Sequence, residues 1–159
     1  LAAILPRASV EDILIVRPQW REPTAPLGLR AGVVIGTSAP RRVELLKHFA
    51  PQAKSASLRG NITTRLQRCR DGIVGGLLLA KAGLQRINVD LQEFCVIKLP
   101  ADQWVPAPGQ GAIAVQARRD SVTAQLLSAI DDGQGRRAVS LERAVLQALG
   151  GGCGAACGA

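Results

Sequence analysis

Residues 33–42 read Val-Val-Ile-Gly-Thr-Ser-Ala-Pro-Arg-Arg, and this stretch indicates the fold class. The β-branched run at its start is typical of a buried strand. Pro40 fits the first turn of a helix because its fixed φ suits that position. We therefore expect a strand over 33–37 that passes directly into a helix over 40–49, which is the repeating unit of α/β proteins.

The same alternation of strand and helix continues along the chain. Short apolar runs predict further strands at 1–5, 53–58, 73–79, 94–98 and 112–117. Helices are predicted at 62–70, 80–86, 121–130 and 136–149, and a capping-box pattern predicts a short helix over 9–16. Asn61 is the predicted N-cap of the helix over 62–70. These elements indicate an α/β fold with a mainly parallel sheet flanked by helices.

Composition restricts the function classes. The chain has 159 residues, which favours one domain or two small ones, and a net charge of +8. A basic surface suits nucleic acid, an anionic membrane or a small acidic ligand. No apolar stretch reaches the roughly 20 residues that span a bilayer. The four cysteines lack the paired spacing of a zinc site, and a chain that begins with Leu and contains no Met is expected to be a fragment.

Arginines gather where helices begin. Arg41 and Arg42 lie in a first helical turn, where the partial positive charge of the helix disfavours cations. An anion bound by the free N–H groups there would explain both arginines, and an exposed, solvated pair is the alternative. Arg59 and Arg65 repeat the arrangement at the next helix, and Arg86 closes a third. Since ligands bind at the carboxyl ends of strands in such folds, an elongated ligand with several acidic groups is expected.

Cys153 and His48 are the two further residues whose side chains could take part in catalysis. Cys153 follows three glycines after the longest predicted helix, and an exposed thiol near basic residues is a candidate reactive thiolate. An incidental thiol in a turn is the alternative. His48 is the only histidine, and its place late in a helix gives a Ser-His-Asp or Cys-His mechanism little support.

Six segments resemble the porphobilinogen deaminase family, also called hydroxymethylbilane synthases, in family order and at family spacing. They are 35–42, 57–66, 79–86, 106–112, 142–144 and 151–153. The resemblance implies domains like those of type II periplasmic binding proteins, plus the start of a third, α+β domain. By this comparison the second domain is 7–105, a partial first domain is 1–6 with 106–130, and the truncated third domain is 131–159.

The resemblance also implies a reaction and a site. The family condenses four porphobilinogen molecules head to tail onto a dipyrromethane primer, releasing ammonia and hydroxymethylbilane, in tetrapyrrole biosynthesis. Cys153 matches the cysteine that holds the dipyrromethane cofactor covalently. The family's catalytic aspartate is expected upstream of residue 1, so this chain alone is expected to be inactive. The residues implied to bind cofactor and substrate are Thr37, Ser38, Arg41, Arg42, Arg59, Asn61, Arg65, Ala80, Gly83, Arg86 and Gln110.

The family resemblance also implies where the protein acts and what it binds. The resemblance implies a cytoplasmic monomer that acts on porphobilinogen, with no metal, nucleic acid or membrane partner. A non-enzymatic module that binds an anionic small molecule is one alternative, and it predicts an unmodified, dispensable Cys153. A nucleic-acid binder is another, and it predicts affinity that falls steeply with salt. The sequence offers that second alternative no recognition motif and no aromatic stacking pattern.

Overall fold

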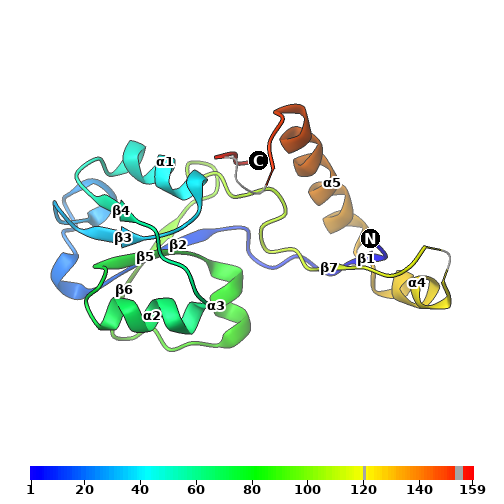
Figure 1. The fold of residues 1–159 in the computed structure, drawn as a ribbon, viewed down its shortest axis with the longest axis horizontal. Coiled ribbons are helices and arrows are strands. Elements are labelled where there is room, and N and C mark those ends of the chain that lie inside the picture. Colours follow the sequence, from blue (N-terminus) through cyan, green and yellow to red (C-terminus); the bar gives the residue numbers. More distant parts are fainter. Residues whose placement is uncertain (120, 153–155) are drawn as a thin grey trace.

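Residues 1–119, 121–152 and 156–159 are described by a computed structural model, which contains a five-stranded sheet and a separate two-stranded sheet (Figure 1). In the larger sheet, β3 is parallel to β4 and β5, whereas β2 is antiparallel to β5 and β6. Four of its strands therefore run in one direction, as expected for a mainly parallel sheet. In spatial order the strands are β4 (Lys54–Ala56), β3 (Val34–Gly36), β5 (Gly76–Ala80), β2 (Asp12–Val16) and β6 (Cys95–Leu99).

Helices cover both faces of this sheet. Helix α1 (Pro40–Phe49) lies on one face, and α2 (Ile62–Arg70) and α3 (Lys81–Ile87) lie on the other (Figure 1). Successive residues of a strand point to opposite faces. Leu78 therefore enters the core cluster under α1, while its neighbour Leu79 enters the cluster under α2 and α3. Together with the loops between them, these elements form what we call the sheet body, residues 12–104.

The segment 9–16 was predicted to contain a helix, and this prediction is wrong, because it forms strand β2. All five residues of β2 are buried between β5 and β6. A strand covered on both faces is apolar throughout and lacks the alternation that usually marks a strand. The Ser9 hydroxyl accepts a hydrogen bond from the backbone N–H of Glu11 and donates one to its carboxylate, so the apparent capping box forms a local turn before the strand.

The helices predicted at 40–49 and 62–70 are present with those bounds. Asn61 is confirmed as an N-cap, since its side-chain oxygen accepts a hydrogen bond from the backbone N–H of Thr64 at 2.8 Å. The remaining predicted strands are present but shorter or shifted by a few residues. The predicted loop over 17–30 contains two short 3-10 turns, Pro18–Trp20 and Pro26–Gly28.

The other elements form what we call the distal region. Strand β1 (Ala3–Ile4) pairs antiparallel with β7 (Ala114–Val115), and α4 (Val122–Leu127), a 3-10 turn (Ser128–Ile130) and α5 (Gly133–Ala148) follow. The segments 2–8 and 111–115 are linked by backbone hydrogen bonds and run side by side from the distal region to the sheet body (Figure 1). The domain boundaries implied by the family resemblance stay a prediction.

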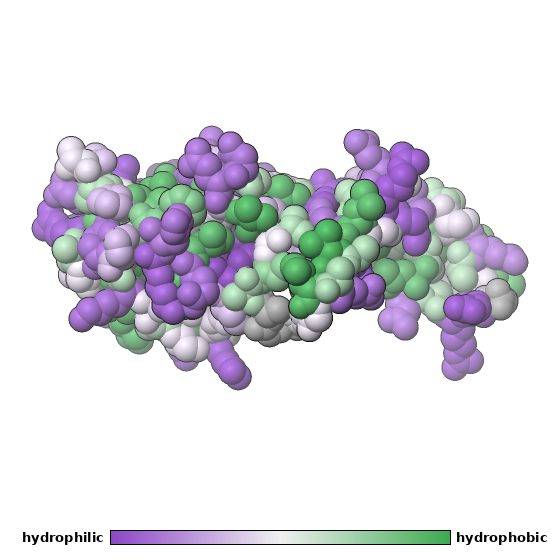
Figure 2. All heavy atoms as spheres, turned by 90° about the horizontal axis from the view of Figure 1, so that it is seen from above, coloured by the Kyte–Doolittle hydropathy of each residue, from purple (hydrophilic) through white to green (hydrophobic). Residues whose placement is uncertain are grey.

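The distal region exposes apolar side chains. Figure 2 shows a hydrophobic strip over α5, where Leu141, Val145 and Leu149 are exposed. Their four-residue spacing places them on one face of the helix. None of the helices in the described residues is long and apolar enough to cross a membrane.

Candidate functional site

The sheet body brings several chain segments to one edge. Because β3, β4 and β5 are parallel, Arg41 after β3, Arg59 after β4 and Ala80 at the end of β5 all lie at the same edge. Strand β2 runs in the opposite direction, so its first residue lies at this edge too. Asp12 is that residue, and it pairs in register with Ala80.

Asp12 is a fully buried carboxylate that accepts four side-chain hydrogen bonds. Its Oδ2 accepts from Nη2 of Arg41 at 2.6 Å and from Nε1 of Trp104 at 3.0 Å. Its Oδ1 accepts from Nη2 of Arg42 at 2.7 Å and from Nε2 of Gln110 at 2.9 Å. Buried charges are tolerated when they are paired and hydrogen-bonded, and Asp12 satisfies both conditions.

Electrostatics keep Asp12 ionised. Burial by itself would raise the pKa of the Asp12 carboxyl, but the hydrogen bonds and positive charges of Arg42 and Arg41 outweigh burial, so its pKa lies below the ordinary value. Burial lowers the pKa of the Arg41 guanidinium, against the opposing effect of Asp12. An arginine still remains protonated at neutral pH, so the cluster of Asp12, Arg41 and Arg42 retains one net positive charge.

The two neighbouring arginines differ in their contacts. Arg41 is 5% exposed, and its Nη1 donates to the carbonyl oxygen of Val105 at 2.6 Å while its Nη2 contacts Asp12. Nη1 of Arg42 makes a longer bond, 3.3 Å, to the carbonyl oxygen of Leu78. Its buried Nε has no acceptor among the described residues. Within the described part of the chain, Arg42 therefore carries one unsatisfied buried donor, while its side chain borders a small cavity at the start of α1.

Three more arginines of the predicted site lie at the same edge or on a neighbouring helix, and one of them, Arg65, feels the charge of Arg42. Burial and the positive charge of Arg42 both lower the pKa of Arg65, whose Nε donates to the carbonyl oxygen of Gly60 at 2.7 Å. Arg59 lies exposed next to Gly60 at the start of the same helix. Arg86 is exposed and donates to the carbonyl oxygen of Gly111 at 2.7 Å. An acidic ligand between Arg42 and Arg65 would relieve the repulsion between these two charges.

The remaining predicted site residues have identifiable structural contacts. Thr37 is buried, and its hydroxyl accepts a hydrogen bond from the backbone N–H of Ala39. Ser38 donates to the carbonyl oxygen of Leu58 at 2.8 Å, close to the start of α1. The side chain of Asn61 caps α2, as described above. A Cβ at Gly83 would lie 2.8 Å from the side chain of Ile62, so this glycine permits close packing of α3 on α2.

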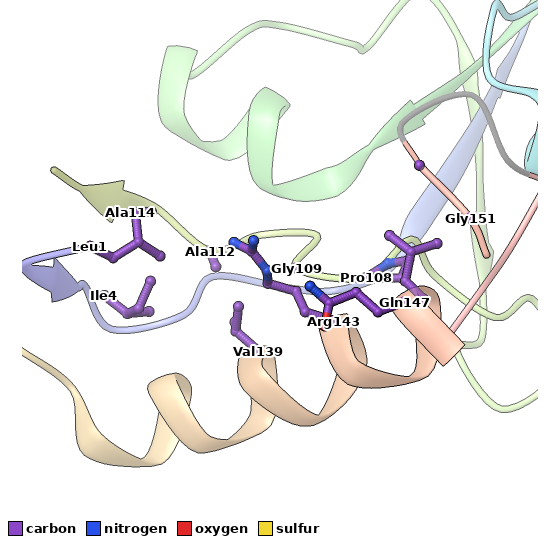
Figure 3. A pocket seen from close by; sticks show the side chains of 12 residues that line it. Leu1, Ile4, Pro108, Gly109, Ala112, Ala114, Val139, Arg143, Gln147 and Gly151 are labelled. Carbon is purple, nitrogen blue, oxygen red and sulfur yellow. The ribbon is translucent and has the colours of Figure 1, made fainter. Parts of the chain in front are cut away.

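Two cavities differ in chemistry. A cavity of about 200 Å³ lies at the start of α1 and is lined by Ser38, Arg42, Gln110 and Cys157, among others. A larger cavity of about 450 Å³ lies between β1, β7 and α5, and residues such as Ile4 and Val139 make its wall mainly apolar (Figure 3). We place the candidate site at the smaller cavity because Arg41 and Arg42, the partners of the buried Asp12 carboxylate, line it. Arg59, Arg65 and Arg86 are not among its lining residues.

The cysteines differ in their surroundings. Burial raises the pKa of the Cys69 thiol to about 11, so this residue behaves as an apolar core residue. Cys157 lines the small cavity beside Arg42. Cys153, the predicted cofactor cysteine, lies outside the described residues. Within the described ranges, no cluster of His, Cys, Asp and Glu side chains is arranged to hold a metal ion.

Asp12 and Trp104 were not predicted as site residues. The available signal was an acidic residue that opens the apolar run 13–16, because a lone carboxylate at the end of a buried strand requires cationic partners. The assumption of a helix over 9–16 hid that signal.

Fold and site together define a class of protein: an α/β protein with a fold like that of type II periplasmic binding proteins, in which two arginines and a buried aspartate border a small cavity. The sequence pattern of one family, described as porphobilinogen deaminase, dipyromethane cofactor binding domain, matches residues 1–125. The chain belongs to this porphobilinogen deaminase family.

Individual proteins agree with this assignment. A porphobilinogen deaminase of Mycolicibacterium gilvum is 42% identical over 161 residues, which cover 100% of the chain and 49% of the relative. One from Xanthomonas oryzae is 40% identical and covers 96% of the chain and 49% of the relative. The chain thus spans about half the length of these relatives. An arginine-specific periplasmic binding protein of Salmonella typhimurium matches 92% of the chain and 63% of its own length, with a TM-score of 0.51 at 8% identity, which supports the fold alone.

Proposed function

We propose that the arginine-lined edge binds the acetate and propionate groups of pyrroles, and that the whole protein is a hydroxymethylbilane synthase. Such an enzyme joins four porphobilinogen molecules head to tail and releases ammonia and hydroxymethylbilane. The arginine pair at the small cavity carries the proposal, because Arg41 and Arg42 line that cavity and the positive charge of Arg42 also acts on Arg65. Membership of the family supplies the identity of the ligand.

The residues of this edge would act by binding and orientation. Arg42, Arg59 and Arg65 would each donate charge-assisted hydrogen bonds to a carboxylate, which are stronger than neutral ones. Several carboxylates held along the edge would fix the pyrrole chain in one orientation, and such positioning lowers the barrier of a condensation step. Asp12 lies within the cluster as its internal counter-charge, where its low pKa keeps it from acting as an acid near neutral pH.

The donor set fits a dipyrromethane cofactor, which is itself a multiply acidic pyrrole. When bound, that cofactor supplies the primer to which new pyrroles are added. Cys153 is the proposed point of attachment, and the arginines at the edge would hold the acidic side chains. Backbone at Ala80 and Gly83 would line the same cleft. We also propose a cytoplasmic monomer, which is consistent with a site built from segments of a single chain.

A module that binds an anionic small molecule without chemistry is the second candidate. The burial of Arg41 and the occupied hydrogen bonds of Asp12 are compatible with either function. The two candidates differ in the state of Cys153, because only the enzyme requires a covalent primer.

Intact mass and peptide mapping of the full-length protein, expressed in cells that make porphobilinogen, test the proposal. We expect a dipyrromethane mass on Cys153 and none on Cys157. The variant Cys153→Ala should lose the added mass and the formation of hydroxymethylbilane, whereas the matched variant Cys157→Ala should keep both. A folded, unmodified Cys153 would favour the binding module.

A further inference from the structure

We propose that Asp12 is the positioning residue of the anion site. Its carboxylate holds Arg41 in a structural position and orients Arg42 toward the ligand. Trp104 and Gln110 in turn hold the carboxylate of Asp12 in place. This inference deepens the proposed function and rests on it for the identity of the ligand. The geometry that supports it is independent of that identity.

The orientation of the Asp12 carboxylate is fixed. A carboxylate offers about four acceptor positions. Four hydrogen-bond donors fill the acceptor positions of the Asp12 carboxylate, two on each oxygen, and the side chain is fully buried. Rotation of the carboxylate would break several of these bonds at once, in surroundings where no water replaces them. Asp12 therefore defines where both guanidinium groups lie.

The contacts divide the two arginines into different roles. The bonds of Arg41 to Asp12 and to the Val105 carbonyl tie α1 to the end of the sheet body. Arg42 is held by Asp12 through one nitrogen, while its Nε stays unpaired among the described residues and its side chain borders the small cavity. Asp12 also separates two neighbouring cations and leaves one net positive charge, and Arg42 is the arginine that can present this charge to a ligand.

Two distant chain segments support Asp12. Trp104 follows β6 and is 2% exposed, with its ring tilted against Phe49 at a centroid distance of 5.7 Å. Gln110 comes from the loop before β7, and its amide also donates to the carbonyl oxygen of Val10. These contacts fix the donors themselves. The position of Asp12 is thus determined by tertiary structure, as expected of a positioning residue in a preorganised site.

A purely structural ion pair is the competing explanation, and the variant Asp12→Asn separates the two. The asparagine keeps the size of the side chain and removes its charge. In the full-length protein, the rate at which phenylglyoxal modifies each arginine can be measured by peptide mass spectrometry. We expect Arg42 to react about tenfold faster in Asp12→Asn, because it loses its charged partner and turns toward solvent. Exposed Arg86 should react at an unchanged rate.

The matched control is Glu11→Gln, one residue away. Glu11 forms an ion pair with Lys81 that is about one-third exposed, and it makes no hydrogen bond to Arg41 or Arg42. This variant should leave the labelling of Arg42 unchanged. Equal labelling of Arg42 in wild type and in a folded Asp12→Asn would overturn the proposal, and so would a uniform increase at all arginines.

Kinetics supply a second measurement. We expect Asp12→Asn to raise the KM for porphobilinogen about tenfold and to change kcat by less than about threefold, since the loss is one of ligand binding. A structural role would lower the amount of active enzyme and leave KM unchanged. If the wild type forms no hydroxymethylbilane, the proposed function fails, while the labelling experiment still decides the role of Asp12.

Should Asp12→Asn not fold, Trp104→Phe takes its place. It removes a single donor to Asp12 and retains an aromatic ring against Phe49. We expect a smaller increase in the labelling of Arg42, about threefold. Unchanged labelling in this variant would contradict the proposed support of Asp12 by Trp104.

Discussion

Leu78 in β5 is fully buried, whereas Leu126 in α4 is 71% exposed. The two leucines illustrate how the sheet body and the distal region differ in the burial of large apolar side chains. The sheet body closes a core on both faces of its sheet. The distal region keeps large apolar side chains at its surface, including the strip over α5 shown in Figure 2. The sheet body is therefore stabilised by its own core, whereas the distal region buries few apolar side chains, such as Ile4 and Val139, and depends more on polar contacts.

Those polar contacts are few and well defined. Arg7, in the segment between the two regions, forms two hydrogen bonds with the carboxylate of Glu142 in α5, and Glu142 also accepts from the backbone N–H of Gly109 at 2.7 Å. Asp131 accepts from the backbone N–H of Ile4 and pairs with Arg136. Local stability varies within proteins, and regions with few buried apolar contacts open first.

The largest effect should come from the core of the sheet body. Leu78→Ala removes a fully buried side chain and should lower the free energy of unfolding by about 2–5 kcal/mol. Leu126→Ala, the same change in the distal region, should alter it by less than about 0.5 kcal/mol. Urea unfolding of the full-length protein measures both. Similar decreases in the free energy of unfolding for the two variants would contradict the difference between the two regions.

The next effect should come from the contacts that hold α5. Glu142→Ala leaves the two Nη groups of Arg7 and the Gly109 N–H without their carboxylate acceptor, at a cost of about 1–3 kcal/mol. Hydrogen exchange should accelerate in α5 and remain unchanged in β2 and β5. Glu44→Ala is the control, because its partner Lys47 is 63% exposed and such pairs contribute little. Faster exchange throughout the sheet body would show that the two regions unfold as one.

Acidification should act on the sheet body through Asp12. The pKa of Asp12 is lower in the folded protein than its ordinary value of 3.8, so its contribution to stability is complete above that value and is lost as the pH falls below it. Unfolding followed by circular dichroism should therefore depend more steeply on pH below about 4 in the wild type than in Asp12→Asn. Identical pH profiles would mean that Asp12 titrates alike in the folded and unfolded states.

The smallest expected difference between the two regions concerns the helix caps. Asn61→Ala removes the cap of α2 in the sheet body and should cost about 1 kcal/mol. Ser121→Ala removes the cap of α4, whose side-chain oxygen accepts from the backbone N–H of Ala124. Since α4 has no buried residue, we expect it to fray locally, with a change of less than about 0.5 kcal/mol in global unfolding. Thermal unfolding of both variants would show whether the caps differ in this way.

The sequence was most informative where the signal was local. Pro40 and Asn61 mark the starts of α1 and α2, and the helices follow with the predicted bounds. Parallel strands end at one edge, which explains why Arg41 after β3 and Arg59 after β4 lie there, and the binding role of the arginines stays a prediction. The direction of β2 could not be predicted, because it depends on pairing with β5 and β6, which lie far away in the sequence. With that direction unknown, the place of Asp12 among the arginines was unknown as well.

The side-by-side segments that join the two regions have a consequence for protein engineering. The sheet body lies between Ala8 and Gly111 in the sequence, and these two residues are linked by a backbone hydrogen bond of 3.2 Å. The intervening stretch contains Asp12, the arginine pair, Trp104 and Gln110. Stretches whose ends lie close together are those that tolerate insertion into other proteins. Residues 8–111 are therefore suited to transfer into a surface loop of a host protein, and the transferred segment would carry Asp12 with all four of its hydrogen-bond donors.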